Sequence, residues 1–150
     1  MVENFPHNPV SSTEVRNGST NFGKTPMVAV VVPTYNEADN LAILAERIFQ
    51  LKIPNTKLII IDDGSPDGTG DFVRSHELFN EKVFLISRNK KMGLGSAYCA
   101  GFSWALERQY NKIIQIDADL SHNPEDILRL IKSSETYDLV IGSRYHKGVN

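Results

Sequence analysis

A short apolar run recurs five times along this chain, and a polar loop follows each run. The runs occupy residues 27–32, 58–61, 83–86, 113–116 and 139–141. Their aliphatic, often β-branched residues predict strands that are covered on both faces, as in a parallel sheet. Segments with helical periodicity separate the runs, so strand and helix alternate. This alternation predicts an α/β fold, with an open, mostly parallel, twisted sheet and helices on both faces.

Four helices are expected between these strands. The first begins near Asp39, where apolar residues start to recur at helical spacing, and Pro54 breaks it. The second and third cover about residues 69–76 and 94–109, and Pro124 opens the fourth. Each polar loop follows the carboxyl end of a strand, which is where open parallel sheets bind ligands. We therefore expect the loops to meet at one edge of the sheet.

Two carboxylates, Asp117 and Asp119, follow the fourth strand at positions i and i+2. Side chains alternate along an extended segment, so both point to the same side. Two carboxylates on one side repel each other unless a cation lies between them, and a divalent cation shared with a diphosphate is one solution. The alternative is that the two aspartates simply open a turn before residues 122–124.

Polar residues also follow the first two strands. Asp63 could accept hydrogen bonds from a nucleobase or a ribose, or it could belong to a helix cap with glycine turns beside it. Tyr35 could stack on a base or pack within the protein, and Glu37 ends the first strand in a similar position. Gly93-Leu94-Gly95 lacks the third glycine of the dinucleotide fingerprint, because Tyr98 stands there, and a tight turn into a helix is the simpler interpretation.

Basic residues cluster in two of the expected loops. The clusters are Arg88 with Lys90 and Lys91, and Arg144 with His146 and Lys147. A run of charge is usually a solvated face, but two runs at the ligand edge, opposite two aspartates, favour phosphate groups instead. We interpret His122 as a capping or core residue rather than a metal ligand, because no second histidine lies near it in the sequence.

Composition narrows the class of protein. A chain of 150 residues with 41% hydrophobic and 23% charged residues suits one globular domain. Its net charge of -2 provides no general attraction to nucleic acid, and its single cysteine excludes an intrachain disulfide. No run is long enough to cross a bilayer, and no signal peptide is evident, so we expect a cytoplasmic protein. Residues 1–25 are polar and aperiodic and are expected to form a disordered tail.

Taken together, the loops resemble those of the family-2 inverting glycosyltransferases, which use nucleotide sugars and have a GT-A fold. The motifs that carry this resemblance are Val32–Glu37, Ile61–Ser65 and Asp117–Asp119. Within the family, the likeness is closest to the dolichol-phosphate and polyprenol-phosphate mannosyltransferases. That likeness rests on Asp63–Thr69, Gly93–Tyr98, Asp117–His122 and Gly142–Tyr145.

The resemblance implies a role for each matching residue. The residues that would line the nucleoside site are Pro33, Tyr35, Glu37, Ile61 and Asp63. Those that would meet the diphosphate are Asp117, Ala118 and Asp119, with Asp117 and Asp119 as ligands of Mg²⁺ or Mn²⁺. Arg144 would contact phosphate on the donor or the acceptor, and Asp119 and Arg144 are the expected catalytic residues. Some family members have Gln where this chain has Ser121, which leaves a third protein ligand of the metal open.

The implied reaction transfers mannose from GDP-mannose to a dolichyl or polyprenyl monophosphate, with inversion. Such an acceptor is largely a dianion at neutral pH, because its second pKa is ~6, so it needs cations more than a general base. We expect the chain to work peripherally, at the cytoplasmic face of a membrane. Residues 26–150 are expected to be the nucleotide-sugar-binding part of a GT-A domain, with the C-terminal acceptor part absent. The alternatives are a transferase of the same family that uses UDP-glucose or another nucleotide sugar, and a non-catalytic nucleotide-binding fragment.

Overall fold

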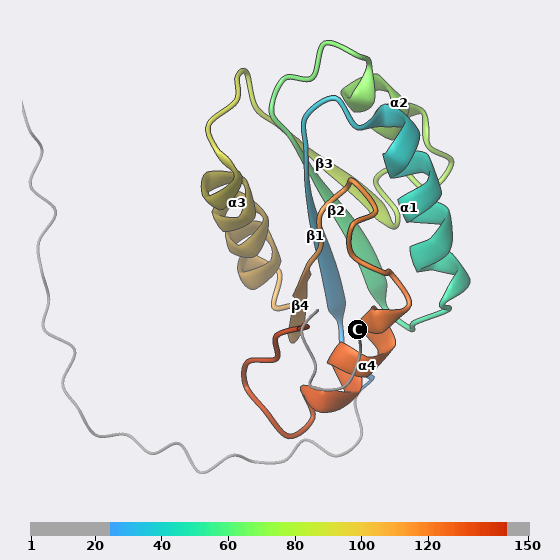
Figure 1. Cartoon of the computed structure of the whole chain (residues 1–150), viewed down its shortest axis with the longest axis vertical. Coiled ribbons are helices and arrows are strands. Elements are labelled where there is room, and N and C mark those ends of the chain that lie inside the picture. Colours follow the sequence, from blue (N-terminus) through green and yellow to red (C-terminus); the bar gives the residue numbers. More distant parts are fainter. Residues whose placement is uncertain (1–24, 144–150) are drawn as a thin grey trace, which may run out of the picture.

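Strands and helices alternate through the computed structural model, which describes residues 25–143 (Figure 1). The strands are β1 (Val28–Thr34), β2 (Thr56–Asp62), β3 (Val83–Ser87) and β4 (Lys112–Gln115). The helices are α1 (Ala38–Gln50), α2 (Thr69–Ser75), α3 (Leu94–Glu107) and α4 (Asp126–Ser133). These elements confirm the expected α/β class. The expected disordered tail lies, except for Thr25, outside the described residues.

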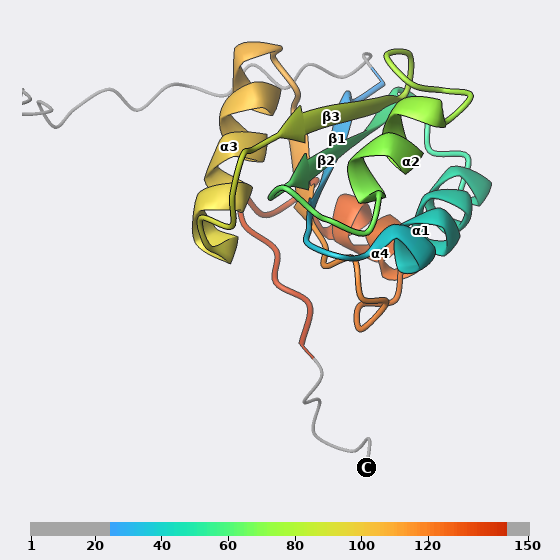
Figure 2. The same cartoon turned by 90° about the horizontal axis from the view of Figure 1, so that it is seen from above.

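The strands form one parallel sheet in the order β3-β2-β1-β4. Helix α3 covers one face, and α1, α2 and α4 cover the other, which gives three layers (Figure 2). The two central strands are almost completely buried, as their unbroken apolar runs predict. None of the helices in residues 25–143 is long and apolar enough to span a membrane.

Alternation along β1 divides the core into two clusters. Val28, Val30 and Val32 face α1, α2 and α4, whereas Ala29 and Val31 face α3. Helix α3 approaches the sheet closely at Gly101, where an added Cβ would lie 2.3 Å from Cγ1 of Val31. A side chain at position 101 would therefore displace the helix that carries one wall of the cavity described below.

Strand β1 runs further than its sequence predicts, because Pro33 does not stop it. Residue 33 pairs in register with Ile61 of β2, and the strand ends only at Thr34. The carbonyl oxygen of Val31 accepts a hydrogen bond from Ile116 on the β4 side, so residue 33 faces that side too. The pairing of β1 with β4 ends at Val31, so the missing N–H of Pro33 costs the sheet no hydrogen bond.

The prediction of a fifth strand at residues 139–141 is wrong. That segment forms no strand, and Leu139 and Ile141 are 78% and 79% exposed. An apolar run becomes a strand only when a sheet edge pairs with it and other side chains cover it. Within residues 25–143 nothing covers these two side chains, so the apolar run alone was not enough to form a strand.

Candidate functional site

A cavity of about 340 Å³ opens where the carboxyl ends of β1, β2 and β4 meet the start of α3. The predicted site residues that line it are Pro33, Tyr35, Glu37, Asp63, Asp117, Ala118 and Asp119. Thr34, Lys91, Gly93, Leu94 and Ala97 complete the lining. The structure thus brings the loops after all four strands to one edge of the sheet, where open parallel sheets bind ligands.

Two predicted site residues are not among the cavity lining. Ile61 has no exposed surface, because alternation along β2 points its side chain into the cluster beneath α3, where α3 covers it. Its side chain is therefore not exposed to the cavity, and its expected place in the nucleoside site stays a prediction. Arg144 lies outside the described residues.

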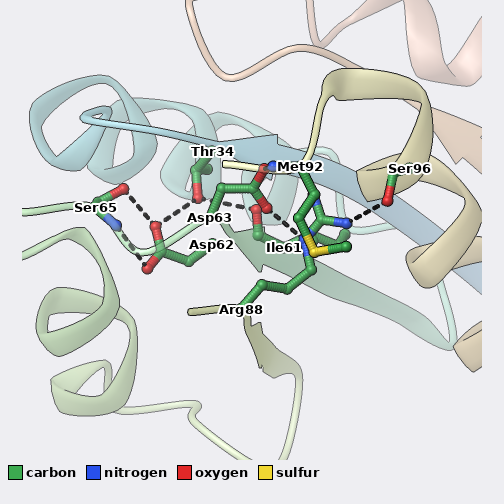
Figure 3. Close-up of polar contacts among 8 residues, drawn as sticks. All are labelled: Thr34, Ile61, Asp62, Asp63, Ser65, Arg88, Met92 and Ser96. Atoms are coloured by element: carbon green, nitrogen blue, oxygen red, sulfur yellow. Dashed lines mark hydrogen bonds and ion pairs between the residues drawn. The ribbon is translucent and has the colours of Figure 1, made fainter. Parts of the chain in front are cut away.

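Asp63 lies in a buried ion pair with Arg88 from the loop after β3 (Figure 3). Its Oδ1 accepts a hydrogen bond from Nε of Arg88 at 2.5 Å, and its Oδ2 accepts one from the backbone N–H of Met92 at 3.0 Å. Burial by itself would raise the pKa of Asp63, but the hydrogen bonds from Arg88 and Met92 together hold that pKa below its usual value. Asp63 is therefore ionised at neutral pH and ties the β3–α3 loop to the end of β2.

The neighbouring carboxylate, Asp62, shapes its own loop. Its two oxygens accept hydrogen bonds from the hydroxyl and the backbone N–H of Ser65 (Figure 3). Gly64 between them has φ +73°, and a Cβ there would lie 3.1 Å from the carbonyl oxygen of Asn89. Asp62 thus closes the turn at residues 62–65, while Asp63 lines the cavity.

Asp117 is held from two directions. Its Oδ1 accepts a hydrogen bond from the hydroxyl of Tyr98 at 2.5 Å, and its backbone N–H donates to Nδ1 of His122 at 3.2 Å. Burial, followed by the contact with Asp117, raises the pKa of Tyr98 well above its ordinary value, so the phenol keeps its proton and acts as the donor. The contact of His122 with the backbone agrees with the expected capping role.

Asp119 begins a turn of its own. Its Oδ1 accepts a hydrogen bond from the backbone N–H of Ser121 at 2.9 Å, and Leu120 between them has φ +60°. A left-handed leucine is uncommon and costs free energy. Asp119 therefore opens a turn, as one of the two interpretations of the sequence predicted, and the same carboxylate also lines the cavity.

The two expected cationic residues nearest the cavity behave differently. Arg88 is bound to Asp63 and to the hydroxyl of Ser96, so its charge is already paired within the protein. Lys91 lines the cavity, and its Nζ lies 4.5 Å from the centre of the Tyr35 ring. Lys91 is therefore the basic residue of this loop that is placed to meet an anionic ligand.

The side chains at the cavity suit a hard divalent cation only if a ligand contributes to its shell. Asp117 and Asp119 provide carboxylate oxygens, which Mg²⁺ and Mn²⁺ prefer. In the described part of the chain, no three or more acidic, histidine or cysteine side chains form a group that could hold a metal. A diphosphate bound beside two carboxylates would supply the missing oxygens, so the residues present fit such an ion.

Sequence reasoning did not find two of the residues that organise this site. Tyr98 was noted as the residue that spoils a glycine fingerprint and as the end of the motif Gly93–Tyr98, with no role assigned to it, and Arg88 was noted as part of a charged loop. A buried tyrosine hydroxyl needs a hydrogen-bond partner, which is a general signal. The sequence could not show, however, that the partner of Tyr98 is Asp117, because the two residues meet only through the packing of α3 on the sheet.

Comparison with known proteins agrees with the fold and with the arrangement of the loops. The α/β sheet and its loop-lined edge define a GT-A-like fold of the nucleotide-diphospho-sugar transferase type. The family described as glycosyl transferase family 2 matches residues 29–150. The chain therefore belongs to glycosyltransferase family 2.

Several curated relatives share substantial identity with the chain. It is 44% identical over 117 residues to an undecaprenyl-phosphate mannosyltransferase of Micrococcus luteus, covering 78% of this chain and 48% of the relative. It is 42% identical to a polyprenol monophosphomannose synthase of Mycolicibacterium smegmatis, covering 83% and 47%. It is 41% identical to a dolichol-phosphate mannosyltransferase of Pyrococcus furiosus, covering 81% and 34%. The chain thus spans about half the length of the first two of these relatives and 34% of the third.

Solved structures show the same fold. A mannosyltransferase from Pyrobaculum calidifontis, in complex with GDP-Man and Mn²⁺, superposes with a TM-score of 0.55 at 26% identity, covering 71% of this chain and 31% of its own. A glucosyl-3-phosphoglycerate synthase from Mycobacterium tuberculosis, in complex with UDP, superposes with a TM-score of 0.57 at 21% identity, covering 75% and 41%. At 21% identity, the likeness to this synthase concerns the fold alone.

Proposed function

We propose that this chain binds GDP-mannose and acts in the transfer of mannose to a dolichyl or polyprenyl monophosphate, with inversion. The observation that carries the proposal is that Asp63, Asp117 and Asp119 line one cavity. They do so in a chain that is 41% to 44% identical to two mannosyltransferases of undecaprenyl phosphate and dolichol phosphate and to a polyprenol monophosphomannose synthase. Because the chain spans only part of these relatives, the activity of the whole protein is part of the proposal.

In the proposed reaction Asp117 and Asp119 would hold Mg²⁺ or Mn²⁺ against the diphosphate of the donor. The cation, when bound, would neutralise the negative charge that builds on the leaving GDP. The solved complex of the Pyrobaculum calidifontis mannosyltransferase with GDP-Man and Mn²⁺ supports this choice of ion. Lys91, at the opposite loop of the cavity, would add a second positive charge near the donor.

The nucleoside would lie against the ends of β1 and β2. Pro33, Tyr35 and Glu37 line this part of the cavity together with Asp63. The Oδ1 and Oδ2 of Asp63 each accept one hydrogen bond from the protein, and each retains a further lone pair for a nucleobase or ribose donor. Ile61 would contribute at most its backbone.

The acceptor would approach as a lipid monophosphate. As a dianion it would attack the mannosyl carbon without a general base, while the carbon–oxygen bond to GDP breaks and the diphosphate keeps the electron pair. We propose that Arg144 binds phosphate on the donor or the acceptor through its two parallel N–H groups. A lipid acceptor would place the protein peripherally at the cytoplasmic face of a membrane.

A second candidate function is nucleotide binding without transfer. The observation that favours it is the cavity itself, because its carboxylates and Lys91 would suffice to bind a nucleotide without an acceptor. The two candidates share the cavity and its carboxylates, and they differ only in whether a bound donor is consumed.

The test measures GDP binding by calorimetry, first with Mn²⁺ or Mg²⁺ and then with EDTA, in the wild type and in Asp119→Ala. We expect at least a tenfold weaker binding in EDTA and in the variant, because the diphosphate then faces carboxylates without a cation. Tighter binding of UDP than of GDP would argue for the UDP-sugar alternative. Equal affinity for GDP with and without the cation would refute the proposed metal role.

Transfer of labelled mannose from GDP-mannose to polyprenyl phosphate is then measured with the same protein. Product formation supports the transferase, whereas intact, cation-dependent GDP binding without product supports the binding module. The alternative donor UDP-glucose is assayed alongside as the specificity control.

A further inference from the structure

Tyr98 lies outside every role proposed above, yet it makes one of the shortest contacts of the site. It lies in the second turn of α3 and is only 5% exposed. Its ring is stacked on Phe102, with 5.9 Å between ring centroids, and its hydroxyl reaches out of the apolar cluster to Oδ1 of Asp117. The aromatic ring therefore serves packing, while the hydroxyl contacts a carboxylate that lines the cavity.

The other contacts of Asp117 hold its backbone rather than its carboxylate, so the Tyr98 hydroxyl is placed to orient that carboxylate. Asp117 follows the end of β4, so the sheet ladder no longer holds its backbone. His122 binds the backbone N–H of Asp117, and its Nδ1 lies 3.7 Å from Oδ2. The Tyr98 hydroxyl, by contrast, donates a short hydrogen bond of 2.5 Å to the carboxylate group itself.

We propose that Tyr98 is a positioning residue of the cation site, whose hydroxyl holds the Asp117 carboxylate in the orientation in which it binds the divalent ion. The inference rests on the proposed function and extends it to a residue of α3. A carboxylate that is fixed in advance loses less conformational entropy when it binds an ion. Hydrogen bonds to ligating carboxylates from outside the metal shell commonly change metal affinity 10- to 100-fold.

The test compares Tyr98→Phe with Tyr110→Phe. Both tyrosines are buried in the same cluster beside α3, and both changes remove only a hydroxyl. The ring of Tyr110 packs on Trp104 rather than near the carboxylates, which makes it the matched control. Mn²⁺ is titrated into each protein at saturating GDP and followed by electron paramagnetic resonance of the free ion. GDP affinity is also measured in EDTA, and unfolding midpoints are recorded without metal.

We expect Tyr98→Phe to weaken Mn²⁺ binding about 10- to 100-fold, with no change in GDP affinity in EDTA. Tyr110→Phe is expected to bind Mn²⁺ as the wild type does. The loss must vanish in an Asp117→Ala background, because the hydroxyl then has no carboxylate to orient.

Unchanged Mn²⁺ affinity in Tyr98→Phe would overturn the inference, and so would an equal loss in the Asp117→Ala background. A fall in Mn²⁺ affinity that matches that of Tyr110→Phe would indicate a general loss of packing and would also overturn it. Failure of the wild type to bind GDP in a cation-dependent way would instead overturn the proposed function, and the inference with it.

Discussion

The pair of Asp63 and Arg88 shows how single residues give this site both its shape and its charge. The two side chains are 7% and 11% exposed, and Nη2 of Arg88 is buried without a hydrogen-bond partner. A buried charge that loses its partner is strongly destabilising, whereas the intact pair is close to neutral relative to apolar packing. The pair is thus sensitive to the loss of either member.

At this scale we predict that Arg88→Met lowers the free energy of unfolding by about 3 kcal/mol at neutral pH. The reason is that Asp63 would remain buried and ionised without its main partner. Urea denaturation measures the effect. Arg74→Met, which removes an exposed ion pair with Asp71, is the control and is expected to change stability little. Similar small losses in both variants would contradict the prediction.

The same pair predicts how the effect depends on pH. The pKa of Asp63 is lowered in the folded protein, so its contribution to stability is present above the unfolded pKa of about 4. That contribution is lost as the pH falls through the lower, folded pKa. We therefore expect the difference between wild type and Arg88→Met to begin to shrink near pH ~4, where Asp63 of the unfolded chain takes up a proton, and to shrink further as the pH falls through the lower folded pKa. A difference that stays constant down to pH 3 would show that the charge of Asp63 is not its cause.

At the scale of elements, α3 does two things: it covers one face of the sheet and it supplies a wall of the cavity. Its close approach depends on Gly101, whose missing side chain leaves room for Val31 and Ile61. Its first turn contributes Leu94 and Ala97 to the cavity. The distance between α3 and the sheet therefore determines whether the hydroxyl of Tyr98 reaches Asp117.

We predict that Gly101→Ala destabilises the fold by about 1–3 kcal/mol or more, because the new Cβ would overlap Val31 in a filled core. Gly95→Ala, in the first turn of the same helix, meets no atom within 4 Å. This control variant should gain up to about 1 kcal/mol through helix propensity. Urea denaturation of both variants checks the prediction, and opposite signs are expected. A neutral Gly101→Ala would mean that α3 can move away from the sheet without cost.

At the scale of the whole molecule, ligand binding and folding are linked because the cavity is assembled from the loops after all four strands. Anything that binds only the folded chain stabilises it, by about 2.7 kcal/mol when its concentration is 100 times its dissociation constant. In the unfolded chain these loops do not form such a site.

We therefore predict that GDP with Mn²⁺ raises the midpoint of thermal unfolding by several degrees, roughly 5–10 °C at saturation. GDP with EDTA is expected to give a much smaller shift. Differential scanning calorimetry makes the measurement, with Asp119→Ala as the variant expected to lose the cation-dependent part. Equal shifts with Mn²⁺ and with EDTA would speak against a cation bridge between carboxylates and diphosphate.

The sequence by itself determined the class of fold and the edge of the sheet at which the site lies. Unbroken runs such as Val28–Val32 are apolar enough to be buried on both faces, and their local periodicity is visible without a structure. The order of strands and polar loops then places Asp63, Asp117 and Asp119 at one edge, since parallel strands end together. These inferences need only short-range patterns and one topological rule.

Only the tertiary structure decided which partners those side chains have. Arg88 meets Asp63 across 25 positions in the sequence and Tyr98 meets Asp117 across 19, and no local pattern encodes either contact. Residues 139–141 stay outside the sheet for the same reason. Orientation and pairing depend on which surfaces pack together, and packing is a property of the assembled chain rather than of any segment.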